Sequence, residues 1–203
     1  MRLWVEGGGD RDSLRRECAK GFRKYVEKVV PRSRRMPQII PCGGRQEAFD
    51  NFCKALKIAG PDVYEVLLVD AEELVDDRHV VKPWGHLARR DRWETPRGAS
   101  DDQAHLMVVT VEAWLAADPP ALKARYKKGF REEALLQSTP DLERVPKEDL
   151  YRALKAATKD TTSGAYGKSD AFRLLGLIDP AKVEARCQRL APRFHAFLRA
   201  NCG

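Results

Sequence analysis

The feature that most constrains the fold is the apolar run in VYEVLLVD, over residues 63–70. A strand with one face in water alternates apolar and polar residues, whereas a run without alternation is typical of a strand covered on both faces. Such strands belong to parallel sheets with helices on both sides. The run therefore predicts an α/β protein with a central parallel sheet, and it ends on an acid, Asp70.

The patterns around this run alternate between strand and helix. Residues 10–30 carry apolar side chains at spacings of three and four, which predicts a helix with Asp10 as its N-cap. In chain order the expected elements are a strand at 2–6, the helix at 10–30, a strand at 38–42, a helix at 43–60, the strand at 63–73 and a strand at about 106–111 that runs directly into a helix. This alternation favours a Rossmann-like sheet flanked by helices.

The second half of the chain has a different character. After residue 118 the sequence predicts only helices, and the last is a long one at 180–201. Residues 74–104 are polar and aromatic without a clear period, so they form either a functional loop or an insertion with short helices. We expect an α/β domain at 1–118 with a loop insertion at about 74–104, and a helical region at 119–203 packed against it.

The bulk composition favours a cytoplasmic protein. Its five cysteines are an odd number without a C-x-x-C pair, which is typical of free thiols in a reducing compartment. The chain shows neither an apolar run of about 20 residues nor a signal-peptide core, so no membrane association is expected. The net charge of +7 fits a nucleic-acid partner, although a well-solvated surface explains it as simply.

Acidic residues follow three of the predicted strands. They are Glu6 and Asp10 after the first strand, Asp70 and Glu72 after the third, and Glu112 after the fourth. Parallel strands present their carboxyl ends at one edge of the sheet, where ligands bind. Carboxylates gathered there repel one another unless a cation lies between them. The pattern predicts a site for Mg²⁺ or Mn²⁺, which prefer oxygen ligands.

Simpler roles remain open for some of these acids. Asp10 can cap the first helix, Glu72 can be a surface acid at a turn, and Glu112 can interact with the dipole at the start of a helix. Glu6 and Asp70 each follow an apolar run, so they are harder to explain in this way. The three glycines after Glu6 would let a phosphate approach the backbone closely, yet VEGGGD lacks the G-K-[ST] ending of a P-loop.

Five stretches carry a family resemblance: VEGGGD, LLVDAEE, PWGHLARRDRW, HLMVVTVEAWLAAD and the late YGKS. Together they span residues 5–169 and resemble the Toprim family, the catalytic domain of topoisomerases, bacterial primases, small ribonucleases and OLD-type nucleases. The spacing of Glu6 and Asp10, and the glutamate before an aromatic in VEAWL, are closest to the OLD type. The chain also resembles uncharacterised bacterial Toprim-like proteins that are often encoded beside an ABC-type ATPase.

The resemblance implies a two-metal site for phosphodiester cleavage. Glu6, Asp70 and Glu72 would hold one ion, and Asp10 and Glu112 would contribute to a second. The usual second aspartate of the family's D-x-D pair is a glutamate here, and whether Glu72 or Glu73 binds the metal stays open.

The resemblance and the basic residues also suggest contacts to nucleic acid. Lys168 in AYGKSD would stabilise charge in the transition state, although a solvated loop lysine is an equally good interpretation. The candidates for binding nucleic acid are Gly8, Arg45, His86, Arg89 and Arg90. Arginine side chains can bind phosphates through two parallel hydrogen bonds. Trp84 and Trp93 can stack on unpaired bases, or they can instead pack their segment onto the sheet.

Three functions follow as hypotheses. The first is a metal-dependent nuclease of the Toprim/OLD type that acts on DNA or RNA, working with a separately encoded ATPase in anti-phage defence. The second is a Toprim-like module with weak or no catalysis that binds and regulates a partner ATPase or nucleic acid. The third is a metal-dependent phosphotransfer enzyme for a small nucleotide, which the net charge of +7 fits less naturally.

Overall fold

The computed structural model describes residues 1–32, 35–60 and 62–203. Within them lies a parallel sheet in the order β2-β1-β3-β4, formed by β1 (Arg2–Val5), β2 (Gln38–Pro41), β3 (Glu65–Asp70) and β4 (Ala104–Met107). The central strand β3 is buried from Glu65 to Val69, which explains its apolar run. The prediction of an α/β fold with a parallel central sheet is confirmed.

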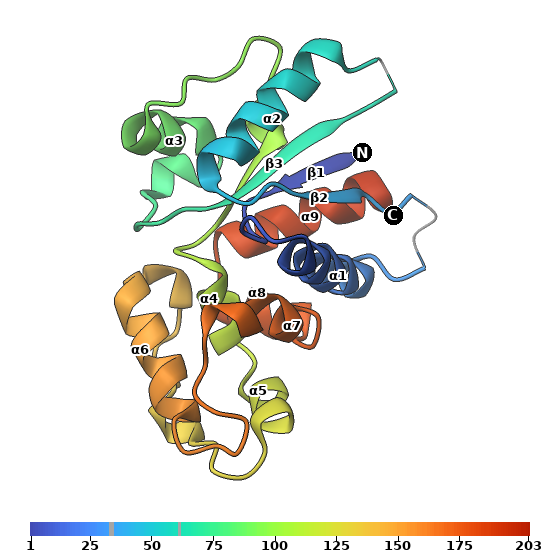
Figure 1. The fold of residues 1–203 in the computed structure, drawn as a ribbon. Helices are drawn as coiled ribbons and strands as arrows, with labels where there is room; N and C mark the ends of the chain where they lie inside the picture. The colour runs from blue at the N-terminus through green and yellow to red at the C-terminus, as the bar shows by residue number, and fades with distance from the viewer. Residues whose placement is uncertain (33–34, 61) are drawn as a thin grey trace.

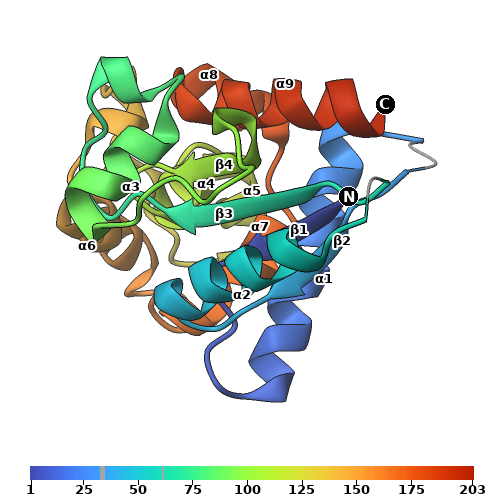
Figure 2. The ribbon, with the colours of Figure 1, turned by 90° about the horizontal axis from the view of Figure 1, so that it is seen from above.

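Helices cover both faces of this sheet (Figures 1 and 2). They are α1 (Asp12–Val29), α2 (Arg45–Ile58), α3 (Pro83–Asp91), α4 (Val111–Ala116), α5 (Pro119–Tyr126), α6 (Lys147–Thr158), α7 (Ala171–Leu175), α8 (Pro180–Arg186) and α9 (Leu190–Cys202). One core holds Leu68 of β3 with Phe22 of α1, and a second holds Leu67 of β3 with Phe52 of α2. None of the helices in the described part of the chain combines the length and apolar character that a bilayer crossing requires.

The C-terminal helices complete the core of the α/β part. Helices α4 to α8 gather below the sheet in Figure 1, and α9 returns to pack on β4. Leu3 of β1 shares one hydrophobic core with Trp114, Leu154 and Leu174 from these helices. The chain passes between them through single turns of 3-10 helix at Glu132–Ala134, Leu142–Arg144 and Lys168–Asp170, with two more at Asp77–His79 and Asp101–Gln103. The expected boundary at residue 118 stays a prediction.

The structure corrects two predicted element ends. Arg11, rather than Asp10, is the N-cap of α1, and its side chain makes no capping hydrogen bond. Strand β4 ends at Met107, so Val108 and Val109 are buried beyond the sheet before α4 begins. An apolar run predicts burial but not backbone pairing, which is why the strand was placed too late in the sequence.

The segment PWGHLARRD forms the helix α3, which agrees with the alternative of an insertion with short helices. Its proline stands at the first helical turn, where a missing N–H is tolerated. The indole of Trp84 donates to the Ser100 carbonyl at 2.8 Å, and the ring of Trp93 stacks on Phe49 at 4.3 Å. Both tryptophans are buried, so the interpretation that they fold this segment onto the sheet is confirmed.

The single long helix predicted near the C-terminus is two helices, α8 and α9. Pro192 lies in the first turn of α9, since further inside a helix it would remove a hydrogen bond and clash with the preceding turn. The buried Glu143 carboxylate lies beside this break. It accepts hydrogen bonds from the backbone N–H groups of Arg189, Leu190 and Ala191 at 2.8–2.9 Å. Glu143 thereby satisfies donors that have no helical partner.

We expect Glu143→Ala to lower the free energy of unfolding by about 3 kcal/mol, because it leaves buried backbone donors without an acceptor. Urea denaturation followed by circular dichroism measures the change. The matched control is Glu148→Ala, which removes an exposed glutamate from α6 and should change stability by less than about 0.5 kcal/mol. Equal losses in the two variants would contradict the capping role.

Candidate functional site

The strand order creates a crevice at the carboxyl ends of β1 and β3. From β1 the chain passes through α1 to β2 on one side, whereas from β3 it continues to β4 on the other. Ligands of open α/β sheets bind at such a point of reversal. Glu6 directly follows β1 and Asp70 is the last residue of β3, so both acids stand at this crevice.

Three carboxylates converge there. One oxygen each from Glu6, Asp70 and Glu72 lies within 4.8 Å of the other two, and this is the one cluster of three or more such ligands among the described residues. Glu72 has φ of 66°, an uncommon conformation for a residue with a side chain, and its N–H donates to the Val109 carbonyl at 2.8 Å. Glu73 is exposed and outside the cluster, so the geometry favours Glu72 as the ligand.

Arg45 is the counter-charge behind Glu6. Its Nη1 donates to Glu6 Oε2 at 3.2 Å, and two bonds of 2.9 and 2.6 Å join its Nε and Nη2 to Asp91. The guanidinium lies 4.9 Å over the ring of Trp93. Burial raises the pKa of Glu6, and the charge of Arg45 offsets only part of this rise. Through these contacts Arg45 holds the carboxylate of Glu6 in a fixed orientation.

Asp70 is held by the start of α4. Its Oδ1 accepts the backbone N–H of Val111 at 3.0 Å, and its Oδ2 lies 3.2 Å from the Thr110 hydroxyl, which is also in closer contact with Glu112 Oε2. Burial, and then the negative charges of the neighbouring glutamates, hold the pKa of Asp70 well above its usual range. A cation among these carboxylates would favour the ionised form and remove the penalty.

Two side chains from the helical part engage the other acids. Lys147 of α6 forms an ion pair with Glu72; burial lowers the pKa of Lys147, but the hydrogen bond and charge of Glu72 outweigh it and the net shift is upward. Glu112 is buried and lies in the first turn of α4, so the alternative prediction that it stands at the start of a helix is confirmed. Its Oε1 accepts the Tyr166 hydroxyl at 2.8 Å. Glu112 therefore lies beside the triad of Glu6, Asp70 and Glu72 but is not part of it.

A pocket of about 450 Å³ opens over the triad. One wall is the glycine loop at 7–9, and another comes from Lys147, Lys168 and Phe172 of the C-terminal helices. The pocket therefore combines acids at the strand ends, two lysines and an aromatic ring, contributed by segments far apart in the sequence.

The glycine loop is locked in place by its backbone. Gly7 and Gly43 exchange N–H to carbonyl hydrogen bonds of 2.9 and 2.8 Å. Gly8 has φ of 89°, and a Cβ added there would lie 2.9 Å from the Arg15 Cα. Only glycine fits this position, and the resulting loop keeps side chains away from the pocket wall.

The donor set of the triad fits a hard divalent cation. Oxygen ligands around Mg²⁺ at about 2.1 Å lie roughly 3–4.2 Å apart in an octahedron, so small side-chain movements would close the observed cluster around an ion. Oxygen-only coordination suits Mg²⁺ or Mn²⁺. Asp10 is exposed and outside the cluster, and Glu112 is held by other partners, so the two-ion arrangement stays a prediction.

The other predicted residues lie at different places around the site. Gly8 and Lys168 line the pocket. His86 is buried with its Nε2 3.0 Å from the Ala71 carbonyl oxygen, and burial lowers its pKa, so it supports the turn after β3 from within. The partly exposed Arg89 and Arg90 pair with Glu73 and Asp91, and their contact with nucleic acid stays a prediction.

Sequence reasoning missed Thr110, Lys147 and Tyr166. Thr110 directly precedes α4 as its N-cap, a threonine position that the rules for helix starts could have identified. Tyr166 stands two residues before Lys168 in a stretch already singled out. Lys147 belongs to no motif, because only the packing of α6 brings it to Glu72.

Comparison with known proteins gives one match. Residues 5–199 match a family model described as a domain of unknown function, DUF4276. No curated protein and no solved structure matches the chain. The resemblance to the Toprim family therefore stays a prediction, and the activity has to be inferred from the chemistry of the site.

We expect Asp70→Asn to raise the melting temperature of the metal-free protein at neutral pH, because it removes a charge that burial and its neighbours disfavour. The raised pKa of Asp70 means that the folded parent binds more protons than the unfolded chain above about pH 4, so its stability falls as pH rises through this window. The stability of the Asp70→Asn variant should therefore fall less than that of the parent as the pH rises. Thermal melts in EDTA between about pH 4 and pH 8 measure both effects, and superimposable curves would contradict them.

Proposed function

Because the chain belongs to the DUF4276 family, whose description names no activity, we propose from its site that it is a metal-dependent nuclease that cleaves phosphodiester bonds in DNA or RNA. The observation that carries this proposal is the convergence of Glu6, Asp70 and Glu72 at the point where the strand order reverses. Bound Mg²⁺ or Mn²⁺ would act there as a Lewis acid and lower the pKa of a bound water.

The protein's own groups would arrange this chemistry. Arg45 fixes Glu6 in place, and the Val111 N–H fixes the carboxylate of Asp70. Lys168, on the same pocket, is suited to neutralise charge that develops on a scissile phosphate. The glycine loop leaves room for a phosphate to approach.

The charge of the chain supports nucleic acid over a small nucleotide as the substrate. A net charge of +7 attracts a polyanion and raises its rate of association. The resemblance to proteins encoded beside an ABC-type ATPase supports a partner ATPase and a role in anti-phage defence as part of this proposal.

A module that binds and regulates without cutting is the second candidate. It is favoured by one observation: Lys147 already neutralises Glu72, so a cation of the protein itself occupies part of the ligand set. The experiments below separate the two candidates.

The first experiment is calorimetry of Mn²⁺ binding, followed by Mn²⁺-dependent cleavage of plasmid, single-stranded DNA and tRNA with the ATPase present. We expect Glu6→Gln and Asp70→Asn each to weaken Mn²⁺ binding at least about tenfold and to abolish cleavage, because each removes one of three anionic ligands. Glu73→Gln is the matched control, since it removes the neighbouring acid outside the triad, and it should bind and cut like the parent.

The outcomes are distinct. Mn²⁺ binding without cleavage of any substrate would favour the regulatory module. A parent that binds no Mn²⁺, or that binds it equally well after Asp70→Asn, would refute the metal centre.

We expect Lys147→Met to bind Mn²⁺ more tightly than the parent, because the variant frees Glu72 from a competing cation. Calorimetry measures this gain. Lys159→Met, which removes an exposed lysine at the end of the same helix, is the control for the change in net charge. Unchanged Mn²⁺ affinity in Lys147→Met would show that the ion pair does not compete with the metal.

A further inference from the structure

We propose that the nucleic acid is bound as a single strand, which runs from the triad along the seam between α1 and α7. The inference rests on the proposed function only for placing the scissile phosphate at the triad. The binding surface itself is argued from a second pocket, from the packing of Phe172 and from three basic side chains.

A second pocket of about 270 Å³ lies on this seam. Three basic side chains, Lys20 and Lys24 of α1 and Arg173 of α7, line it together with one acid, Glu17. It shares Phe172 with the pocket over the triad. One aromatic residue therefore connects an acidic pocket suited to a metal ion with a basic pocket suited to phosphate.

Close packing explains how Phe172 reaches both pockets. A Cβ at Gly21 would lie 2.1 Å from the Phe172 carbonyl oxygen, so α1 and α7 touch along their backbones. The Phe172 ring extends from there to the glycine loop, where a Cβ at Gly7 would lie 2.5 Å from its Cζ. Leu14 of α1 lines the first pocket, and residues from Glu17 to Lys24 line the second. At 1.5 Å of rise per residue, the two sets lie about 5–15 Å apart along α1. Successive nucleotides of one strand can bridge this step.

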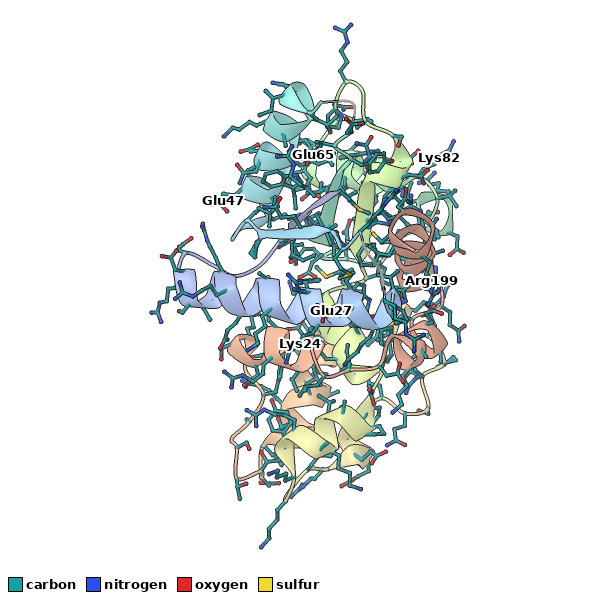
Figure 3. All side chains as sticks on the ribbon, turned by 90° about the vertical axis from the view of Figure 1, so that its right-hand side faces the viewer. Lys24, Glu27, Glu47, Glu65, Lys82 and Arg199 are labelled. Atoms are coloured by element: carbon teal, nitrogen blue, oxygen red, sulfur yellow. The ribbon has the colours of Figure 1, made fainter. Side chains whose placement is uncertain are left out.

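The basic groups of the seam are available to a ligand. Lys20 and Lys24 are exposed, stand one helical turn apart and form no ion pair with a described residue. A Cβ at Gly176 would lie 3.2 Å from the Lys24 Cδ, so the stem of this lysine lies against the end of α7. Figure 3 labels Lys24 at the edge of α1. Arg173 is half-exposed and pairs with Glu17 at 3.0 Å, a surface pair that a phosphate can replace at little cost.

The shape of the site favours a single strand over a duplex. The triad lies beneath a pocket walled on one side by the glycine loop and on the other by residues of α6 and α7. A duplex is stiff, and bending it into such a pocket requires several kcal/mol, on the order of 1–6 for a strong bend. A single strand bends freely and can stack a base on an aromatic ring such as that of Phe172.

The test is fluorescence anisotropy with a labelled oligo(dT), the equivalent oligo(U) and a duplex of the same length, in EDTA so that no metal-dependent cleavage occurs. We expect the single strands to bind at least about tenfold more tightly than the duplex. The double variant Lys20→Gln/Lys24→Gln should weaken single-strand binding and lower the salt slope by about 1.4, at about 0.7 per lost contact. Phe172→Leu should weaken binding with the salt slope unchanged.

Lys54→Gln/Lys57→Gln is the charge-matched control, because it removes two exposed lysines from α2, which packs in the other core of the protein. Duplex binding as tight as single-strand binding, no binding of either, or equal effects of the two double variants would overturn the proposal. Since the assay contains no metal, failure of the nuclease would leave these results unchanged and would appear only in the Mn²⁺ experiments.

Discussion

The constraint on which the rest of the site depends is the mutual repulsion of Glu6, Asp70 and Glu72. The pairing of β1 with β3 forces the first two together, and the left-handed turn at Glu72 adds the third. Folding must therefore supply counter-charge and hydrogen-bond donors from elsewhere. Arg45 of α2 and Lys147 of α6 meet this need from opposite parts of the molecule, and Asp91 of α3 holds Arg45 in place.

Local pattern was sufficient to predict the first three strands, the helices between them and the acids that follow the first and the third. The alternation of strands and helices along the chain predicts a parallel sheet, and the carboxyl ends of parallel strands meet at one edge. Lys147 was out of reach because no local pattern encodes the packing of α6 on the strand ends. The break between α8 and α9 depends on Glu143, a residue that lies 46 positions before its partner Arg189.

Two segments show why composition alone does not decide burial. Residues 83–93 mix aromatic and basic side chains, which is the composition of an exposed loop, but Trp84 in α3 and Trp93 beyond its end find partners in the segment before β4 and on α2. Val108 and Val109 are likewise buried in the core although they do not pair with another strand of the sheet. The whole fold determines which side chains are buried and what they contact. A pattern in a short window of sequence predicts only which side chains are apolar enough to be buried.

The distribution of the pocket along the chain also affects how the protein is made. A ribosome releases Glu6 and Asp70 well before Lys147, Lys168 and Phe172. Domains fold as their residues emerge, so an incomplete chain carries the acids but not the pocket that surrounds them. The pocket can therefore form only after the segment from Lys147 to Phe172 has left the ribosome.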